Sequence, residues 1–116
     1  MKKYKHDLHT SNYTNLYHEK EFENNAPHVF EVKDTNGNLL TSVSFQDGPI
    51  KEAGVNGVHN EDLIAMVICR LEHFNDSPFK SRDNAMAITK LEEALLWLRK
   101  RTLGRERRGV EGTNKI

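Results

Sequence analysis

Two runs of residues in the first half of the chain have the composition of β-strands. Residues 28–33 and 39–46 are rich in β-branched and aromatic residues, and in the second run apolar residues alternate with serine. Between them lies Asn36-Gly37, and an Asn-Gly pair supplies the positive φ that a tight hairpin turn requires. The pattern therefore predicts one antiparallel β-hairpin over residues 27–47.

A first amphipathic helix is predicted after residue 60. Asn60 has the chemistry of an N-cap, and the acidic residues that follow it suit the positive end of a helix. Apolar residues then recur at spacings of three and four, which is typical of a helix with one buried face. We expect this helix to run from about Glu61 to His73 or Phe74. Its apolar stripe consists of Ile64, Val67, Ile68, Leu71 and Phe74.

A second helix is predicted to begin after Ser81, which is a favourable N-cap. It should run to about Thr102, because Gly104 weakens a helix by about 1 kcal/mol relative to alanine. A short loop between two helices predicts an antiparallel helical hairpin. Apolar side chains spill onto more than one face of the second helix, so a single partner helix does not cover them, and we expect the protein to self-associate. The main stripe is Ala85, Ile88, Leu91, Leu95 and Leu98.

The predicted fold class is α+β, a small antiparallel β-hairpin or sheet followed by an antiparallel two-helix hairpin, in an oligomer. The polar residues before position 27 show no clear period, and we expect a loosely ordered lead-in with one short edge strand around Tyr13–Tyr17. We expect the rest of the chain to form a single ligand-binding domain. The predicted parts are a lead-in over 1–26 and a domain over 27–116, made of the hairpin 27–47, a Gly-rich linker 48–59, a helical hairpin 60–103 and a C-terminal loop 104–116.

Length and composition narrow the class of protein. A chain of 116 residues fits one domain, and it has no apolar run of the roughly 20 residues that a membrane-spanning helix needs. No apolar segment follows the first lysines, so we expect no secretory signal. The single cysteine, Cys69, excludes an internal disulfide and suits a reducing cytoplasm. Hydrophobic residues make up 36%, a low share that again favours burial between subunits.

A zero net charge conceals an uneven distribution of charge. Residues 1–60 hold six Lys, no Arg and eight acidic residues, whereas residues 61–116 hold four Lys, seven Arg and nine acidic residues. Six basic residues fall within 99–108, against the single acid Glu106. This balance lacks the overall basicity of a domain that coats nucleic acid. It indicates a local cationic site for a small anionic partner.

Arg101, Arg105 and Arg108 are the strongest candidates for such a site. At spacings of four and three they share one face of a helix, where like charges repel. An anion between them turns that repulsion into attraction, because guanidinium groups grip phosphate oxygens in pairs. The alternative is a solvated basic turn that suits the negative end of the helix dipole.

Two further candidates lie at the connection between the helices. Phe74, with Phe79 close by, would offer a ring on which a base can stack, or would close the hydrophobic core instead. Arg82-Asp83-Asn84 opens the second helix, where outward N–H groups favour an anion and the Asn84 amide can read a base edge or a ribose hydroxyl. Ordinary helix capping is the alternative for this triplet.

Catalysis finds little support in the sequence. The six His show no metal-ligand spacing, one cysteine does not make a thiolate zinc site, and no phosphate-binding loop or nucleophile motif is present. Cys69 lies beside the apolar stripe and is expected to be a small core residue. We therefore predict a binding protein and no enzyme, with no metal and no cofactor.

Three stretches carry a resemblance to a known family. They are Phe45-Gln46-Asp47-Gly48-Pro49-Ile50-Lys51-Glu52 with Gly54-Val55-Asn56-Gly57-Val58, then Arg82-Asp83-Asn84-Ala85-Met86-Ala87-Ile88-Thr89-Lys90-Leu91-Glu92-Glu93-Ala94, and Arg107-Arg108-Gly109-Val110-Glu111-Gly112-Thr113. Over residues 27–116 the chain resembles the phage Thoeris anti-defence sponges, which share a helical hairpin with the phage anti-CBASS cyclic-oligonucleotide sponges. Residues 1–26 carry no motif of that family.

The resemblance implies a protein that acts in the cytoplasm of the infected bacterial host. It would sequester glycocyclic ADP-ribose, the signal of TIR-domain Thoeris proteins, without degrading it, in a pocket where subunits meet. Related sponges form homodimers and hexamers, and some bind cyclic di- or trinucleotides at separate sites. The implied ligand contacts are Phe74 (base stacking), Asn84 (a polar contact), Arg101 and Arg105 (phosphate), Arg82 (a cyclic trinucleotide), and Arg108 to Thr113 (a loop that closes over the ligand).

Two rival functions stay open on the sequence alone. The first is a basic helical-hairpin adaptor, which would use the same basic tail to bind nucleic acid or protein. Its binding to polymers would depend steeply on salt concentration. A hydrolase for the same nucleotides would have only His59, His73 and scattered carboxylates to work with. The neutral overall charge argues against a nucleic-acid polymer as partner, and no membrane partner is expected.

Overall fold

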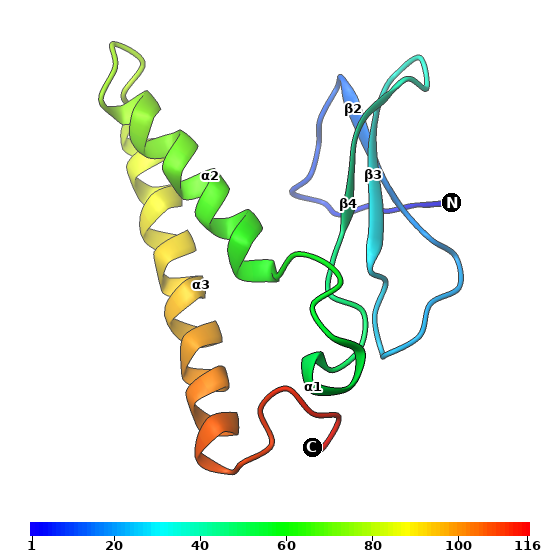
Figure 1. The fold of residues 1–116 in the computed structure, drawn as a ribbon. Coiled ribbons are helices and arrows are strands. Elements are labelled where there is room, and N and C mark those ends of the chain that lie inside the picture. Colours follow the sequence, from blue (N-terminus) through cyan, green and yellow to red (C-terminus); the bar gives the residue numbers. More distant parts are fainter. The chain divides into compact units, whose positions relative to one another are not determined.

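A computed structural model describes residues 1–116, which form two compact units, Met1–Val58 and His59–Ile116. The first unit is a four-stranded antiparallel sheet in the order β1-β2-β3-β4, of which Figure 1 labels β2, β3 and β4. The second unit is a helical hairpin with a C-terminal tail. The predicted α+β class, with an antiparallel sheet followed by helices, is confirmed. The strands are β1 (Lys2–Lys3), β2 (Thr14–His18), β3 (Val29–Asp34) and β4 (Leu39–Ser44).

The N-terminal segment belongs to the sheet, which corrects the expectation of a loosely ordered lead-in. The strand predicted around Tyr13–Tyr17 is β2, but it lies between β1 and β3 and not at the edge of the sheet as predicted. It pairs along its whole length with β3, with Leu16 opposite Val32. The two residues of β1 then pair with the end of β2. A two-residue strand has too few positions to show a period-two pattern, so it forms through its partner and leaves no signal in the sequence.

The predicted hairpin is formed by β3 and β4. Asp34 and Asn38 close the turn, with the Asp34 N–H donating to the Asn38 carbonyl at 2.9 Å. Only Gly37 has positive φ there (86°), a conformation that glycine adopts without steric cost. The Asp34 carboxylate accepts hydrogen bonds from the N–H groups of Asn36 and Asn38 and from the Asn38 side-chain amide, at 2.9–3.0 Å.

We expect the stability of this turn to depend on pH. The side-chain hydrogen bond from Asn38, reinforced by backbone hydrogen bonds, lowers the pKa of Asp34 below its ordinary value. A carboxyl with a lower pKa in the folded state stabilises the fold above its unfolded pKa, and this stabilisation is lost as the pH falls through the folded pKa. The difference in urea midpoint between wild type and Asp34→Ala should therefore be largest near pH 7 and should shrink in strong acid. Asp7→Ala, at an exposed position, is the control. A difference in urea midpoint between wild type and Asp34→Ala that stays the same at every pH would contradict the prediction.

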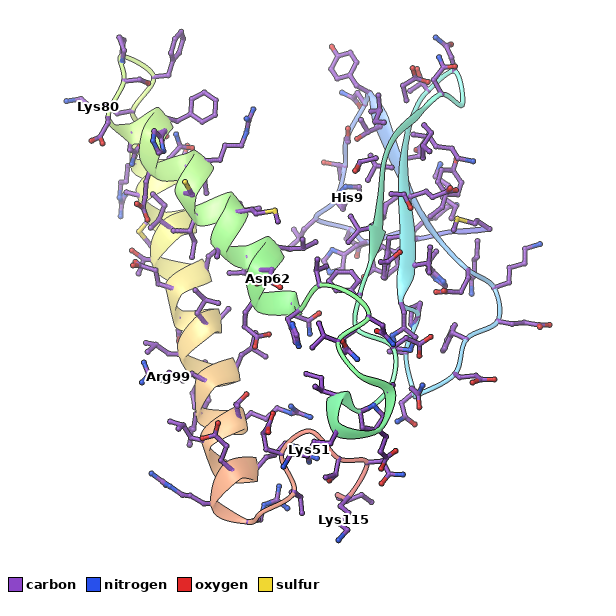
Figure 2. The ribbon with its side chains drawn as sticks, viewed as in Figure 1. His9, Lys51, Asp62, Lys80, Arg99 and Lys115 are labelled. Atoms are coloured by element: carbon purple, nitrogen blue, oxygen red, sulfur yellow. The ribbon has the colours of Figure 1, made fainter.

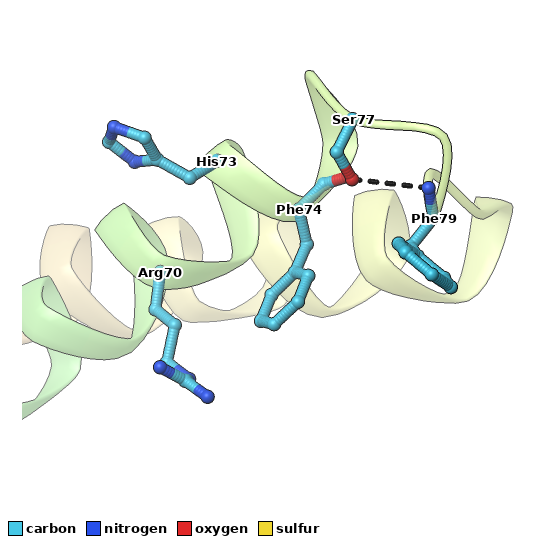
Figure 3. Close-up of a pocket in the computed structure, with 5 residues that line it drawn as sticks. All are labelled: Arg70, His73, Phe74, Ser77 and Phe79. Carbon is cyan, nitrogen blue, oxygen red and sulfur yellow. Dashed lines mark hydrogen bonds between the residues drawn. The ribbon is translucent and has the colours of Figure 1, made fainter.

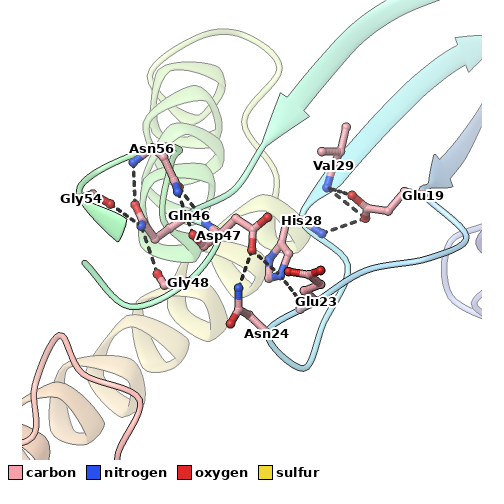
Figure 4. A network of polar contacts seen from close by, with 10 residues as sticks. All are labelled: Glu19, Glu23, Asn24, His28, Val29, Gln46, Asp47, Gly48, Gly54 and Asn56. Atoms are coloured by element: carbon pink, nitrogen blue, oxygen red, sulfur yellow. Dashed lines mark hydrogen bonds and ion pairs between the residues drawn. The ribbon is translucent and has the colours of Figure 1, made fainter. Parts of the chain in front are cut away.

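The segment after β4, predicted as a Gly-rich linker, is held by a dense set of hydrogen bonds (Figure 4). The Gln46 amide donates to the carbonyls of Gly48 and Gly54 at 3.1 and 2.7 Å. The Asn56 side-chain oxygen accepts from the Asp47 N–H at 2.8 Å, and the Asn56 side-chain NH2 donates to the Asp47 carbonyl at 2.7 Å. The four-residue helix α1 (Ile50–Ala53) lies inside this loop. The first stretch that carries the family resemblance therefore has a structural role.

Gly57 shows how tightly the loop closes on the end of β4. A β-carbon at this position would overlap the carbonyl group of Phe45, because Val58 bridges to Phe45 next to it. Backbone atoms cannot move aside as a flexible side chain can, so only glycine fits here.

His28, which is 7% exposed, connects the loop before β3 with the segment after β4 through polar contacts. Its Nε2 donates to the Glu23 carbonyl at 2.7 Å and lies 3.4 Å from Asp47 Oδ1, which also accepts from the Asn24 amide at 2.8 Å. The Glu19 carboxylate accepts from the His28 N–H at 2.9 Å. Buried polar groups are stable only when they are hydrogen-bonded, and this network meets that requirement for His28.

The second unit contains α2 (Asn60–Asn75) and α3 (Arg82–Arg107), which pack against each other as the predicted hairpin (Figure 1). The N-cap of α2 is His59 rather than Asn60, and the Asp62 carboxylate accepts the His59 N–H at 2.8 Å. Ser81 caps α3 as predicted, with its Oγ accepting the Asn84 N–H at 3.0 Å. No helix of the structure has both the length and the apolar character needed to cross a bilayer.

Gly104 does not end the second helix, which corrects the predicted boundaries at Thr102 and at 104. The helix continues to Arg107, and Gly109 (φ 71°) then reverses the chain. The cost of one glycine is about 1 kcal/mol, and basic residues in the last turn offset part of it through the helix dipole. Those residues are Arg105 and Arg107.

The hairpin buries only part of its apolar surface. Ile68, 8% exposed, is its one buried apolar side chain, whereas Val67 of the predicted stripe is 46% exposed. Cys69 is exposed as well, which corrects its expected place in the core. Exposed apolar side chains in such number are typical of a surface that binds a partner or ligand. The large exposed apolar residues of the two helices are Met66, Val67, Phe74, Phe79, Met86, Leu96, Trp97 and Leu103.

Candidate ligand-binding site

An open pocket of about 510 Å³ lies at the end of the helical hairpin where α2 meets the interhelical loop. Its volume falls in the range of roughly 300–1,000 Å³ that small-molecule sites occupy. We name it the tip pocket; it is lined by Arg70, His73, Phe74, Ser77 and Phe79 (Figure 3).

Two aromatic rings dominate the tip pocket. Phe74 is 40% and Phe79 77% exposed, so neither ring closes the hydrophobic core. The core alternative that the sequence left open for Phe74 is therefore wrong for this chain on its own. A ring left open to solvent in a pocket is free to stack on a planar ligand.

Arg70 belongs to the same pocket, although the sequence analysis did not select it. Its guanidinium carbon lies 5.2 Å from the centroid of the Phe74 ring, within the range of a cation–π contact (Figure 3). Arg70 precedes Phe74 by four residues, and residues at that spacing are neighbours on a helix surface. This spacing was the signal available in the sequence. The pair presents a positive charge beside a stacking surface.

Hydrogen bonds hold the loop that carries Phe79. The Ser77 hydroxyl donates to the Phe74 carbonyl at 2.5 Å and accepts from the Phe79 N–H at 3.1 Å. Asn75 Oδ1 accepts from the Ser81 N–H at 3.1 Å, which ties the end of α2 to the cap of α3. The pocket wall is therefore formed before any ligand arrives.

Asn84 and Arg82 lie in the first turn of α3. The Asn84 N–H is used by the Ser81 cap, while its side-chain amide, partly buried, makes no hydrogen bond within the chain. Arg82 is exposed and has no ion-pair partner. Neither residue lines the tip pocket within one copy of the chain. Their predicted ligand contacts stay predictions.

Arg105 and Arg108 hold the C-terminal tail. Arg105 Nη2 faces the carbonyls of Val110, Thr113 and Lys115 at 3.0, 3.1 and 2.9 Å. Arg108 Nη1 donates to the Ile116 carbonyl at 2.7 Å. The spacing of these arginines predicts a role toward phosphate but not this second role, because the contacts with the tail depend on how the tail folds back.

Arg105 keeps binding capacity after it has fixed the tail. A guanidinium carries five N–H donors, and the contacts to the tail use only those on Nη2, which leaves Nη1 and Nε. Arg101, one turn earlier, is exposed and has no ion-pair partner in the chain. The Thr113 hydroxyl donates to the Val110 carbonyl at 2.6 Å and shapes the tail.

The structure divides the predicted site residues between the two ends of the hairpin. From Arg82 to Arg105 the helix rises about 35 Å at 1.5 Å per residue. A compact ligand cannot span that length. Within one copy, Phe74 and Asn84 at one end and Arg101, Arg105, Arg108 and Thr113 at the other therefore do not form one pocket.

A histidine and the single cysteine lie together on α2. The His73 Nδ1 donates to the Cys69 carbonyl at 2.8 Å and lies 3.8 Å from Cys69 Sγ, on the exposed surface of α2. No group of three or more His, Cys, Asp or Glu is arranged to hold a metal ion. An exposed ring beside a guanidinium, as in the tip pocket, suits a planar, anionic ligand.

Comparison with known proteins identifies relatives along the whole chain. The model of one protein family, the Acb2/Tad1 hairpin domain, matches residues 41–103. The protein Thoeris anti-defense 1 of Bacillus phage SBSphiJ7 is 49% identical over 142 residues, a match that covers 99% of this chain and 99% of the relative. The family match includes most of the last β-strand, the loop after it and nearly all of the helical hairpin.

Proposed function

This chain belongs to the Thoeris anti-defence sponge family of phage proteins, and from this premise we propose that it captures a cyclic nucleotide immune signal and releases it unchanged. The proposed ligand is glycocyclic ADP-ribose, and the proposed place of action is the cytoplasm of the infected bacterial host. Membership of a family of sponges supports binding rather than catalysis. Cyclic di- or trinucleotides are proposed as further ligands at separate sites, with Arg82 as a contact for a trinucleotide.

The exposure of Phe74 is the observation that carries the proposal. A phenylalanine that ends the apolar stripe of α2 would ordinarily be buried, yet it is 40% exposed beside the Arg70 guanidinium. A base stacked on such a ring contributes roughly 1–3 kcal/mol. The neighbouring positive charge favours a ligand that carries phosphate.

We propose that one ligand is shared by two copies of the chain. Two hairpins packed side by side in opposite directions would bring the tip pocket of one copy to the tail arginines of the other. Their exposed apolar side chains, Trp97 (62%) and Leu96 (67%) among them, lie along the α3 surface that such a dimer would cover. Dimers of this kind are also the proposed building block of a hexamer.

Such a site meets the energetic demand of sequestration. A dissociation constant in the nanomolar range corresponds to about −12 kcal/mol. One base stack contributes roughly 1–3 kcal/mol and each hydrogen bond to a charged group about 1.5–3 kcal/mol, so Phe74, Arg101 and Arg105 account for a large part of it. The preformed loop at Ser77 and the fixed tail reduce the cost of ordering the site.

Retention and release of the ligand test the proposal. The protein is mixed with glycocyclic ADP-ribose, free ligand is removed by filtration, and the retained complex is heated to unfold the protein. We expect ligand of unchanged mass to return to solution in a fixed ratio to the protein. Ligand of altered mass would indicate a hydrolase, and loss of all ligand in the filtration step would refute sequestration. Binding of long nucleic acids with a steep salt dependence would favour the adaptor instead.

Arg70→Ala should weaken retention of glycocyclic ADP-ribose by up to about 5-fold, because an exposed ion pair between its guanidinium and a ligand phosphate contributes about 0.2–1 kcal/mol. Arg70→Lys keeps the charge near the Phe74 ring and should stay within about twofold of wild type. Competition binding with labelled ligand measures both. Identical affinities for wild type and Arg70→Ala would show that Arg70 does not take part in the site.

A further inference from the structure

A second pocket, of about 210 Å³, lies in the sheet unit at the N-terminal strand pair. It is formed by β1, β2 and the loop between them, on which His9 is labelled in Figure 2. None of its residues has a part in the proposed function at the helical hairpin. We name it the N-terminal pocket; it is lined by residues 3–6, His9, Ser11 and residues 14–16.

The lining of the N-terminal pocket is cationic. It contains Lys3, Lys5, His6 and His9, and no carboxylate. Asp7 is the one acidic residue before position 19, and it does not line the pocket. Neither lysine takes part in any ion pair of the chain. Uncompensated cations around a shared concavity attract an anion.

Backbone and side-chain hydrogen bonds fix the walls of this pocket. The Tyr4 N–H donates to the Leu16 carbonyl at 2.9 Å, which extends the pairing of β1 with β2. The Ser11 hydroxyl oxygen accepts from the Thr14 N–H and hydroxyl at 3.1 and 2.8 Å. The arrangement therefore exists without a ligand, and preorganisation of this kind favours binding.

His6 supplies a donor in either protonation state. Its Nδ1 accepts the Leu8 N–H at 3.0 Å, so the neutral imidazole carries its proton on Nε2. The Tyr4 and His6 rings lie 6.4 Å apart at 30°, which places flat surface next to the charged groups. Lysine, an imidazole N–H and serine are groups that bind phosphate oxygens.

We propose that the N-terminal pocket binds a phosphate monoester of a small sugar or nucleoside. Its volume corresponds to about seven water molecules at roughly 30 Å³ each, which accommodates a phosphate with part of an attached sugar. It is less than half the volume of the tip pocket. The N-terminal pocket is thus matched to a smaller ligand than the doubly phosphorylated signal proposed for the hairpin.

Two-dimensional amide NMR of the full chain tests this proposal, with titrations of inorganic phosphate, ribose 5-phosphate, AMP, adenosine and sulfate. We expect ribose 5-phosphate and AMP to shift the signals of residues 3–16, with ribose 5-phosphate tighter than inorganic phosphate and adenosine without effect. Lys3→Gln with Lys5→Gln should weaken AMP binding at least tenfold, whereas Lys20→Gln, outside the pocket, should leave it unchanged. The Phe74→Ala variant should bind AMP in the N-terminal pocket as wild type does, which separates this site from the hairpin.

Several results would overturn the proposal. If sulfate shifted the signals as much as AMP does, the effect would be charge screening, and if adenosine did so, it would be stacking; neither is recognition of phosphate. If inorganic phosphate bound as tightly as ribose 5-phosphate, the pocket would not recognise a phosphate ester. An equal loss in Lys20→Gln would show that overall charge decides binding. Should the double lysine variant unfold, absence of shifts at residues 3–16 in the wild-type titration would by itself refute the site.

Discussion

Phe74→Ala should weaken retention of glycocyclic ADP-ribose about 10- to 100-fold while the chain stays folded. The ring is 40% exposed, so its removal leaves no large cavity, and the loss falls on the ligand. A stacked base is worth roughly 1–3 kcal/mol, and Arg70 also loses the ring against which it lies at 5.2 Å. Equilibrium binding of labelled ligand, together with the urea midpoint, measures the two effects separately.

Phe22→Ala provides a matched control for this variant. Phe22 has a similar exposure, 46%, but belongs to the sheet unit and lies outside residues 41–103, which match the family. Its removal should leave ligand affinity within about twofold of wild type. Equal affinities of Phe74→Ala and wild type would contradict the stacking role, and an equal loss in Phe22→Ala would show a general effect of removing exposed rings.

Arg105→Ala should reduce affinity more, about 30- to 5,000-fold, because truncating one partner of a desolvated charge pair costs about 2–5 kcal/mol. It should also free the tail, since Nη2 holds the carbonyls of Val110, Thr113 and Lys115. Faster amide exchange over residues 110–115 reports the freed tail, and equilibrium binding reports the lost affinity.

Three further variants separate the two roles of Arg105. Arg101→Ala, which has no tail contact to lose, should weaken binding without faster exchange in the tail. Arg105→Lys keeps the positive charge but loses the planar guanidinium, so its affinity for the ligand should lie between those of wild type and Arg105→Ala. Arg99→Ala removes an exposed arginine of α3 that makes no ion pair and should bind as wild type does (Figure 2). If Arg105→Ala freed the tail and bound ligand normally, Arg105 would have a structural role only.

The regular elements of the fold were predictable because their signals are local. Three such signals each depend on a few neighbouring residues, and all three features are found in the structure. They are the alternation of apolar residues with serine before Phe45, the Asn36-Gly37 turn and the Ser81 cap. The β1 strand and the continuation of α3 through Gly104 were not predictable in this way. β1 forms only through its pairing with β2. The helix α3 continues through Gly104 because one glycine costs only about 1 kcal/mol, which the basic residues of the last turn partly offset.

Candidate site residues were predictable as types but not as an arrangement. Spacing placed Phe74 at the end of a helix and the arginines on one helical face, yet it did not indicate which ring would remain exposed. Arg70 was missed although it precedes Phe74 by four residues, because that spacing alone does not show that the ring stays exposed beside the guanidinium. The contacts of Arg105 with the tail depend on Gly109 reversing the chain, which a helical interpretation of residues 101–108 does not foresee.

The measurement that tests the shared site most directly uses two defective variants together. Phe74→Ala and Arg105→Ala chains, with different affinity tags, are co-expressed and the mixed dimer is purified through both tags. In a two-fold dimer one of the two sites then receives Phe74 from one copy and Arg105 from the other, so about half of the wild-type ligand capacity should return. Capacity no greater than that of either variant alone would show that the two residues do not meet across a subunit boundary.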